Sequence, residues 1–158
     1  AIARAIELIR QSAANGTINL NTNGSMPSAL ERCIEAGLDA VRISLNSFRP
    51  RVYAAYYRPR GYGLDEVFQS VRIAISRKLR VSLNLLTHPG VTDDEEEIAA
   101  MRAFLRRWPV AMVQTRTLNI DPTRYFEAVG RPREPLGMRR ALDAIRDVTR
   151  VGNFTHTH

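Results

Sequence analysis

The regular alternation of two hydrophobic patterns constrains the fold of this chain more than any other feature. Stretches with apolar residues at helical spacing are separated by short stretches in which apolar and polar residues alternate one by one, as in strands. Strands joined by helices of about ten or more residues predict βαβ units, with parallel strands and right-handed crossovers. The pattern therefore predicts the α/β class, as a partial (βα) barrel fragment with about four parallel strands flanked by helices.

The predicted elements fill most of the 158 residues. Strands are expected at 17–23, 40–46, 80–87 and 110–118, and the tail 151–158 could start another strand. Helices are expected at 2–13, 27–36, 64–79, 92–107 and 136–150, with a shorter segment around 52–57 and a loop rich in Pro and Arg before the last helix. Residues 1–122 would form the barrel units, and residues 123–158 a loop, a helix and a tail of the same domain.

An acidic run marks the start of the helix expected at 92–107. Thr92 followed by Glu95 predicts a capping box, in which the two side chains satisfy backbone N–H groups of the first turn. Asp93, Asp94 and Glu95 would also complement the positive end of the helix. We interpret the run as helix capping rather than as a metal site.

Each predicted strand has one apolar and one polar face. In residues 40–46, Val41 and Ile43 alternate with Arg42 and Ser44. Strands of a parallel sheet that is covered on both sides usually read as continuous apolar runs. We therefore expect helices on one face, with the polar face forming the inner wall of an open or partial barrel around a polar ligand. A closed eight-stranded barrel needs about 250 residues, so four units amount to roughly half of one.

The carboxyl ends of the four predicted strands are all polar and turn-forming. They comprise residues 22–24, 44–47, 87–90 and 119–122. Any single strand-to-helix turn prefers such residues. Ligands of parallel α/β folds sit at the carboxyl ends of the strands, so four such ends beside a polar face favour a ligand site.

The sequence at these ends resembles the radical SAM superfamily, in the pattern of its molybdenum-cofactor-type members. The resemblance rests on Thr22-Asn23-Gly24, on Ser44-Leu45-Asn46 and on the segment 81–84 leading into residues 89–93, and it covers about residues 1–122. It implies a partial barrel that binds S-adenosylmethionine (SAM) and a 4Fe-4S iron–sulfur cluster. Reductive cleavage of SAM in that superfamily yields a 5'-deoxyadenosyl radical, which abstracts hydrogen from the substrate, so the cofactors supply the chemistry.

The resemblance also implies a cofactor site, although it implies no catalytic residue. The positions that would contact SAM are Thr22, Asn23, Ser44, Asn46, Asn84, Arg116 and Leu118. Thr22 and Ser44 would bond the amino-acid portion or the ribose, and Asn46 stands where the superfamily often has Asp. Arg116 is the candidate for a carboxylate or a substrate anion, because a guanidinium binds such groups bidentately. Backbone atoms near Leu118 would meet the adenine.

The single cysteine sets this chain apart from the superfamily pattern. The cluster there is held by three cysteines in a CxxxCxxC segment, whereas this chain has only Cys33, which we interpret as a small buried hydrophobic residue. The cluster ligands are therefore expected outside this chain, which would be the carboxyl-terminal half of the domain or a degenerate version of it. Alone it would be inactive, while the parent protein would be an enzyme supplied by a reductant.

Other functions rest on fewer residues. A non-catalytic half-barrel that binds SAM or a nucleotide is one alternative. An RNA-contacting module is another, because the net charge is +7 and segment 49–62 mixes Tyr with Arg. His156 and His158 could bind a metal, and His88 could donate a proton. The substrate, small molecule or peptide, is not specified. The single cysteine favours a reducing, cytoplasmic location. The lack of a long apolar run predicts that the chain does not cross a membrane.

Overall fold

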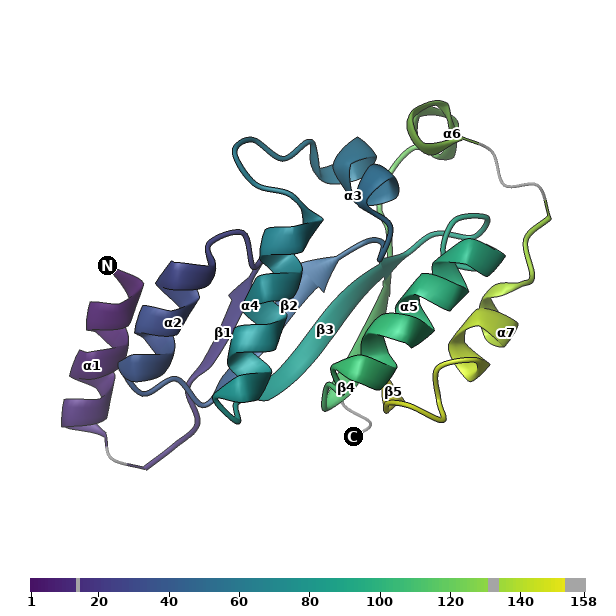
Figure 1. The fold of residues 1–158 in the computed structure, drawn as a ribbon. Coiled ribbons are helices and arrows are strands. Elements are labelled where there is room, and N and C mark those ends of the chain that lie inside the picture. The colour runs from purple at the N-terminus through teal and green to yellow at the C-terminus, as the bar shows by residue number, and fades with distance from the viewer. Residues whose placement is uncertain (14, 131–133, 153–158) are drawn as a thin grey trace.

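The computed structural model describes residues 1–13, 15–130 and 134–152, and in them five parallel strands form one sheet in the order β1-β2-β3-β4-β5 (Figure 1). The strands are β1 (Asn19–Thr22), β2 (Ala40–Leu45), β3 (Arg80–Thr87), β4 (Met112–Thr117) and β5 (Val151–Gly152). The helices are α1 (Ile2–Ser12), α2 (Pro27–Glu35), α3 (Pro50–Tyr57), α4 (Leu64–Ser76), α5 (Glu95–Arg107), α6 (Pro122–Val129) and α7 (Met138–Asp143). The predicted fold class is confirmed, with a fifth short strand where the tail begins.

Helices cover one face of the sheet. In Figure 1, α4 and α5 lie in front of the strands, and α2 lies beside β1. Val41 and Ile43 of β2 and Leu83 of β3 are at most 1% exposed and pack with Val67 of α4 and Met101 of α5 in one core. Their partners in alternation, Arg42, Ser44, Ser82 and Asn84, are only partly buried. The alternating sequence of each strand thus assigns one face to the helices and leaves the other polar.

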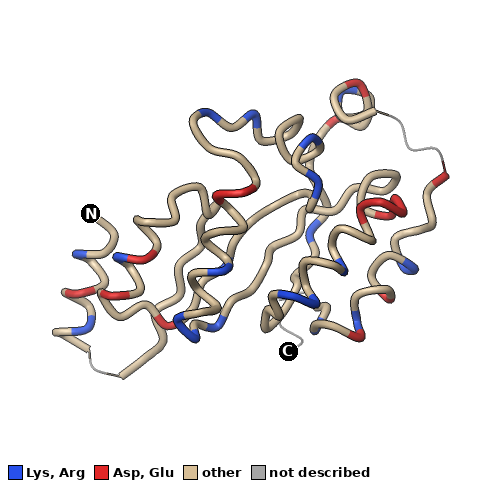
Figure 2. Tube along the Cα trace, viewed as in Figure 1, with Lys and Arg blue, Asp and Glu red and all other residues tan. Residues whose placement is uncertain are grey.

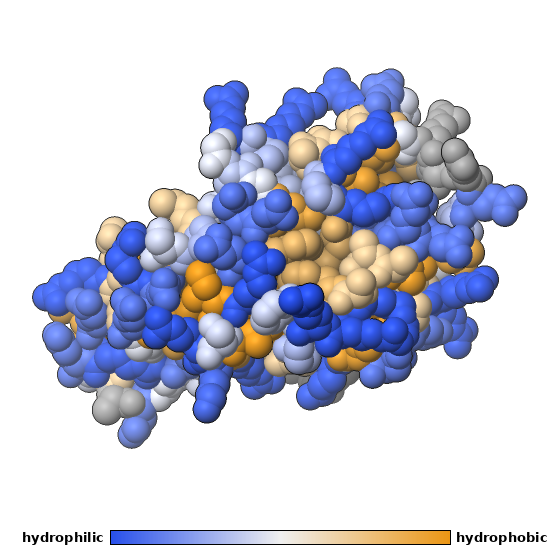
Figure 3. Space-filling view, in the orientation of Figure 1, coloured by the Kyte–Doolittle hydropathy of each residue, from blue (hydrophilic) through white to orange (hydrophobic). Residues whose placement is uncertain are grey.

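The outer side of the helix layer is mostly hydrophilic. Figure 3 shows charged and polar side chains around a smaller apolar area at the centre of this side. Between α4 and α5, Phe68 and Phe104 stack with ring centroids 4.2 Å apart and pack on Phe48, which joins the two helices to the core. No helix in the described ranges is long and apolar enough to span a membrane.

The helix α6 occupies part of the segment that the sequence was expected to leave as a loop. It begins at Pro122, and the side chain of Asp121 caps it by accepting a hydrogen bond from the backbone N–H of Arg124 at 3.0 Å. Together with α3 it lies beyond the carboxyl ends of the strands, at the top of Figure 1. The prediction failed although Tyr125, Phe126 and Val129 form a short apolar stripe that packs in one cluster, because the helix has only eight residues in a stretch rich in Pro and Arg.

The predicted capping box at Thr92 and Glu95 is wrong. The N-cap of α5 is Asp94, whose carboxylate accepts from the N–H of Glu97 at 3.2 Å. Thr92 instead accepts from the backbone N–H of His88, and Asp93 accepts from Gly90 and from Gly137. The acidic run therefore does cap a helix, two residues later than expected, and also ties down the turn before it. The described residues contain no metal-ligand cluster of three acidic, His or Cys side chains.

The last predicted helix is shorter than 136–150. The helix α7 ends at Asp143, and tighter turns follow, in which the N–H groups of Ile145 and Arg146 donate to carbonyls only three residues earlier. Val151 then pairs with Val113 of β4, which confirms a strand at the start of the tail. His156 and His158 lie outside the described residues.

Candidate functional site

A row of polar side chains crosses the uncovered face of the sheet near the carboxyl ends of the strands. Ser44 on β2 is in register with Asn84 on β3, which is in register with Gln114 on β4. Partners in a parallel register point to the same side of the sheet, so the three side chains form a line across three strands. The amide nitrogen of Asn84 donates to the hydroxyl of Ser44 at 3.1 Å. The structure therefore brings two of the predicted site residues together and adds Gln114.

Two acceptors of this row lack a hydrogen-bond donor within the described part of the chain. They are Oδ1 of Asn84 and Oε1 of Gln114, and Gln114 is only 3% exposed. Leaving a buried acceptor without a partner costs about 1 to 3 kcal/mol, so such groups commonly mark a ligand position. A ligand carrying N–H or O–H donors would satisfy both.

Thr22 lies on the other side of the sheet. Its register partner is Ile43, which faces the helices, and its Oγ1 accepts from the N–H of Gly24 at 3.1 Å. Asn23 similarly accepts from the N–H and the hydroxyl of Ser25. The geometry therefore does not place the side chain of Thr22 beside Ser44, and a SAM contact by Thr22 stays a prediction.

The backbone conformation and the close packing at Gly24 explain why this turn ends in glycine. Its φ is +70°, and a Cβ there would come within 3.0 Å of Cγ2 of Ile43. Its carbonyl also accepts from the hydroxyl of Ser70 on α4 at 2.7 Å. The Thr-Asn-Gly turn thus allows close packing between the end of β1 and α4.

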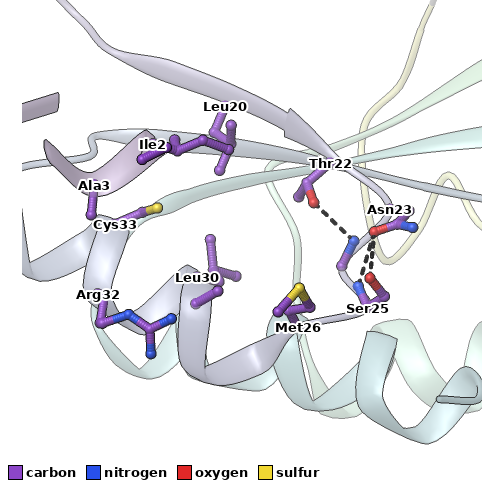
Figure 4. A pocket seen from close by; sticks show the side chains of 13 residues that line it. Ile2, Ala3, Leu20, Thr22, Asn23, Ser25, Met26, Leu30, Arg32 and Cys33 are labelled. Atoms are coloured by element: carbon purple, nitrogen blue, oxygen red, sulfur yellow. Dashed lines mark hydrogen bonds between the residues drawn. The ribbon is translucent and has the colours of Figure 1, made fainter. Parts of the chain in front are cut away.

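A cavity of about 340 Å³ opens beside this turn, between β1, α1 and α2. Figure 4 shows its apolar lining, with Leu20, Leu30 and Ile2 around it and the polar atoms of the turn at one end. Cys33 lies in the wall and is 5% exposed, as expected for a small buried hydrophobic residue, and burial raises the pKa of its thiol.

Asn46 connects the end of β2 to both helices beyond the sheet. Its side chain is 1% exposed, and its amide nitrogen donates to the carbonyl of Val52 on α3 at 3.3 Å and to the hydroxyl of Tyr125 on α6 at 3.0 Å. Oδ1 of Asn46 has no partner within the described residues. Both amide hydrogens are committed to these acceptors, so Asn46 can offer a ligand only its carbonyl oxygen.

The turn that follows Asn46 is held from below by Glu97 of α5. This carboxylate is 1% exposed and accepts from the hydroxyl of Ser47 at 2.5 Å, from the N–H of Phe48 at 2.6 Å and from Nε of Arg49 at 2.9 Å. Burial raises its pKa, and these donors act in the opposite direction. The sequence did not indicate this role, because Glu97 directly follows acidic residues that were interpreted as capping the helix.

The remaining predicted positions lie along the carboxyl ends of β3 and β4. Arg116 is exposed and is in register with Leu86, on the same face as the polar row. Leu118 is 4% exposed, packs with Tyr125, and donates its N–H to the carbonyl of Thr87. Its N–H is thus occupied, and its carbonyl already accepts from the N–H of Ile120 at 3.2 Å, so an adenine contact by this backbone stays a prediction. The ring of His88 packs edge-on against Tyr125 and its Nδ1 lies 2.7 Å from the carbonyl of Pro89.

The comparison with protein families decides among these interpretations. Residues 1–101 match the model described as the radical SAM superfamily. The chain belongs to this superfamily. The resemblance of the turn sequences is thereby confirmed.

Curated relatives within the radical SAM superfamily share part of this sequence. A GTP 3',8-cyclase from Heliobacterium modesticaldum is 34% identical over 95 residues, which are 59% of this chain and 28% of the relative. A probable GTP 3',8-cyclase from Methanosarcina acetivorans is 31% identical over 109 residues, or 66% of this chain and 32% of the relative. The chain thus spans about a third or less of the length of the curated relatives that it matches.

Solved structures share the fold. A domain of pyruvate-formate lyase-activating enzyme from Bacteroides vulgatus covers 96% of this chain with a TM-score of 0.70 at 13% identity, and 89% of that domain is covered. A radical SAM methyltransferase from Sphaerobacter thermophilus covers 94% with a TM-score of 0.66 at 16% identity, with 45% of that chain covered. Both likenesses concern the fold alone.

The residues of this radical SAM chain do not fit an iron–sulfur cluster. Such clusters are held by several thiolates, and the sequence has one cysteine. Cys33 is buried on α2, under the helix-covered side of β1 and away from the polar row. No step of chemistry is therefore assigned to a cluster on this chain.

Proposed function

We propose that this chain provides the SAM-binding part of a radical SAM domain, with the cluster ligands supplied from outside the 158 residues. The observation that carries the proposal is the row of Ser44, Asn84 and Gln114 on the uncovered face of the sheet. It combines a hydroxyl with two acceptors that have no donor among the described residues, and it lies toward the carboxyl ends of the strands, where ligands of parallel α/β folds sit.

The chemistry of this row fits SAM. The ammonium of the amino-acid portion and the ribose hydroxyls are donors, and the free oxygens of Asn84 and Gln114 are acceptors. Arg116, on the same face, provides a guanidinium for a carboxylate. When SAM is bound at a reduced cluster in this superfamily, it supplies a 5'-deoxyadenosyl radical. The residues of this chain would bind SAM and orient it.

The proposal is tested by titrating SAM into the ¹⁵N-labelled chain under anaerobic conditions. We expect the side-chain amide signals of Asn84 and Gln114 to shift together, because both oxygens would gain donors. Adenosine, which lacks the amino-acid portion, should shift them less. If SAM leaves both signals unchanged while the fold is intact, the row is not a SAM site.

The single cysteine supports a second candidate, a non-catalytic unit that binds SAM or a nucleotide and acts through a partner. The two functions differ in their products. We would incubate the chain with SAM and dithionite, with and without a reconstituted segment that carries the three cluster cysteines, and measure 5'-deoxyadenosine against that segment alone. Its formation would favour an enzyme, whereas SAM binding without 5'-deoxyadenosine would favour the non-catalytic unit.

A further inference from the structure

Several arginines whose guanidiniums are unpaired among the described residues lie at or beyond the carboxyl ends of the strands. Many basic side chains elsewhere are in ion pairs, such as Arg102 with Asp147 and Arg77 with Glu31. Within the described residues, no hydrogen bond or ion pair is made by the guanidinium of Arg51, Arg58, Arg60, Arg116 or Arg124, and the same holds for Arg32 and Arg72 on α2 and α4. Figure 2 shows basic positions along α3, the loop after it and α6, at the top of the molecule, and Figure 3 shows hydrophilic side chains projecting there.

Two of these arginines share one cavity. It lies between α3 and α6, has a volume of about 380 Å³, and is lined by Arg58 from the end of α3 and Arg124 from α6. Tyr56 and Tyr125 also line it, with their rings edge to face and centroids 6.1 Å apart. Two guanidiniums from different helices, together with aromatic walls, suit a small ligand with an anionic end.

The backbone at Arg58 supports a role for this side chain. Its φ of 46° and ψ of 54° are left-handed, at the C-cap position of α3 where glycine is usually found. An ordinary side chain in this conformation is strained, and such strain gathers at functional positions. The residue caps the helix by donating its N–H to the carbonyl of Ala54 at 2.9 Å, which a glycine would do equally well. The guanidinium is what distinguishes Arg58 from the residue that the backbone prefers.

Acidic residues limit the size of an anion that the cavity can take. Asp121 lines the cavity and accepts from the N–H of Arg124, and Glu127 lies beside Arg58 and Arg124 on the adjoining surface. These carboxylates would repel an extended polyanion that ran along α6. A compact group between the two guanidiniums avoids most of this repulsion.

We propose that the cavity between α3 and α6 binds the phosphate group of a small molecule through Arg58 and Arg124. Tyr125 lines this cavity, and its hydroxyl accepts from Asn46 at the end of β2, so the cavity adjoins the candidate SAM site. The phosphate would then anchor a substrate, a role that rests on the proposed function. Binding of the phosphate itself does not depend on that function.

The experiment is calorimetric titration of inorganic pyrophosphate into the chain and three variants. Arg124→Gln removes one guanidinium, and Arg58→Asn removes the other while keeping a residue that tolerates the left-handed conformation. Arg80→Gln, exposed at the amino end of β3, is the control for loss of one charge. We expect the first two variants to weaken binding at least about tenfold, because each removes a charge-assisted bond, and the control to change it little. Thermal unfolding checks that each variant folds.

Three outcomes would overturn the proposal. The first is that the wild-type chain does not bind pyrophosphate. The second is that all three variants weaken pyrophosphate binding equally, which would show a general charge effect. The third is that a single-stranded oligoribonucleotide binds more tightly than pyrophosphate and loses affinity in the same two variants, which would indicate an RNA surface. SAM titration of the Arg124→Gln variant separates this result from the proposed function, because the SAM row does not include Arg124.

Discussion

The carboxylate of Glu97 on α5 accepts the hydroxyl hydrogen of Ser47, at 2.5 Å and 50 residues away along the chain. The same carboxylate binds the backbone N–H of Phe48 and Nε of Arg49. One buried side chain therefore fixes the turn that begins at Asn46, and with it the position of the residues that end β2.

Replacing Glu97 by Gln should destabilise the protein strongly. The amide NH₂ of glutamine cannot accept the hydrogen bonds that one carboxylate oxygen of Glu97 now accepts. Arg49 would also lose its most buried ion-pair partner. Breaking such a buried pair costs about 3 to 5 kcal/mol, which urea unfolding would measure. The control is Glu96→Gln, since Glu96 pairs with the same arginine but its side chain is 84% exposed. Equal stability of the two variants would contradict the role of Glu97.

Ser44→Ala should weaken SAM binding if the row on the uncovered face holds SAM. The substitution removes the hydroxyl that would bond SAM and that now accepts from Asn84, and a SAM group left without its partner costs about 1 to 3 kcal/mol. Ser76→Ala is the matched control, because the Ser76 hydroxyl bonds only the carbonyl of Ile73 on the surface of α4. Calorimetry with SAM gives both affinities. Unchanged affinity in the Ser44 variant would remove this residue from the site.

The sequence was informative wherever one strand or helix sets its own pattern. The alternation of Val41 and Ile43 with Arg42 and Ser44 was sufficient to predict both the strand and its two faces. The sequence also indicated where Thr22 lies. Thr22 is two residues after Leu20 on β1, so both side chains point to the helix-covered face. The resemblance to the superfamily, rather than the period, led to Thr22 being grouped with Ser44.

Contacts between distant segments could not be predicted. Glu97 reaches Ser47, and Tyr125 reaches Asn46 across 79 residues, and neither pair has a local pattern. Gln114 had a signal, because it alternates with Thr115 on β4, but only the register with Asn84 places it in the row. Local periodicity thus predicted the sheet, whereas the hydrogen bonds that hold the site residues in place depend on tertiary packing.

Asp39 should stabilise the fold at neutral pH, and this stabilisation should be lost in acid. The backbone N–H of Ile18, followed by Arg10, lowers the pKa of its carboxyl below the usual 3.8. A carboxyl with a lowered pKa stabilises the fold above its unfolded pKa, and this contribution is lost as pH falls through the folded value. Asp39→Asn should therefore lower stability by up to about 1 kcal/mol near neutral pH and flatten the dependence below pH 3.8. Chemical unfolding at several pH values measures this, with Asp65→Asn as the control for loss of one negative charge. A parallel acid dependence in the Asp39 variant and wild type would contradict it.

The tyrosines beyond the strand ends should resist ionisation. Burial raises the pKa of Tyr53, Tyr57 and Tyr125 above the usual 10.0. Between pH 10.0 and those raised values the unfolded chain loses protons that the folded chain keeps, so stability should fall as pH rises through this window. Absorbance titration of phenolate should show these groups ionising only with unfolding.

Tyr125→Phe should remove one of the tyrosines that ionise above the usual pH. It should also lower stability by about 1 kcal/mol, because Asn46 loses a hydrogen-bond acceptor. Full ionisation near pH 10 with the fold intact would show instead that α3 and α6 open readily to solvent.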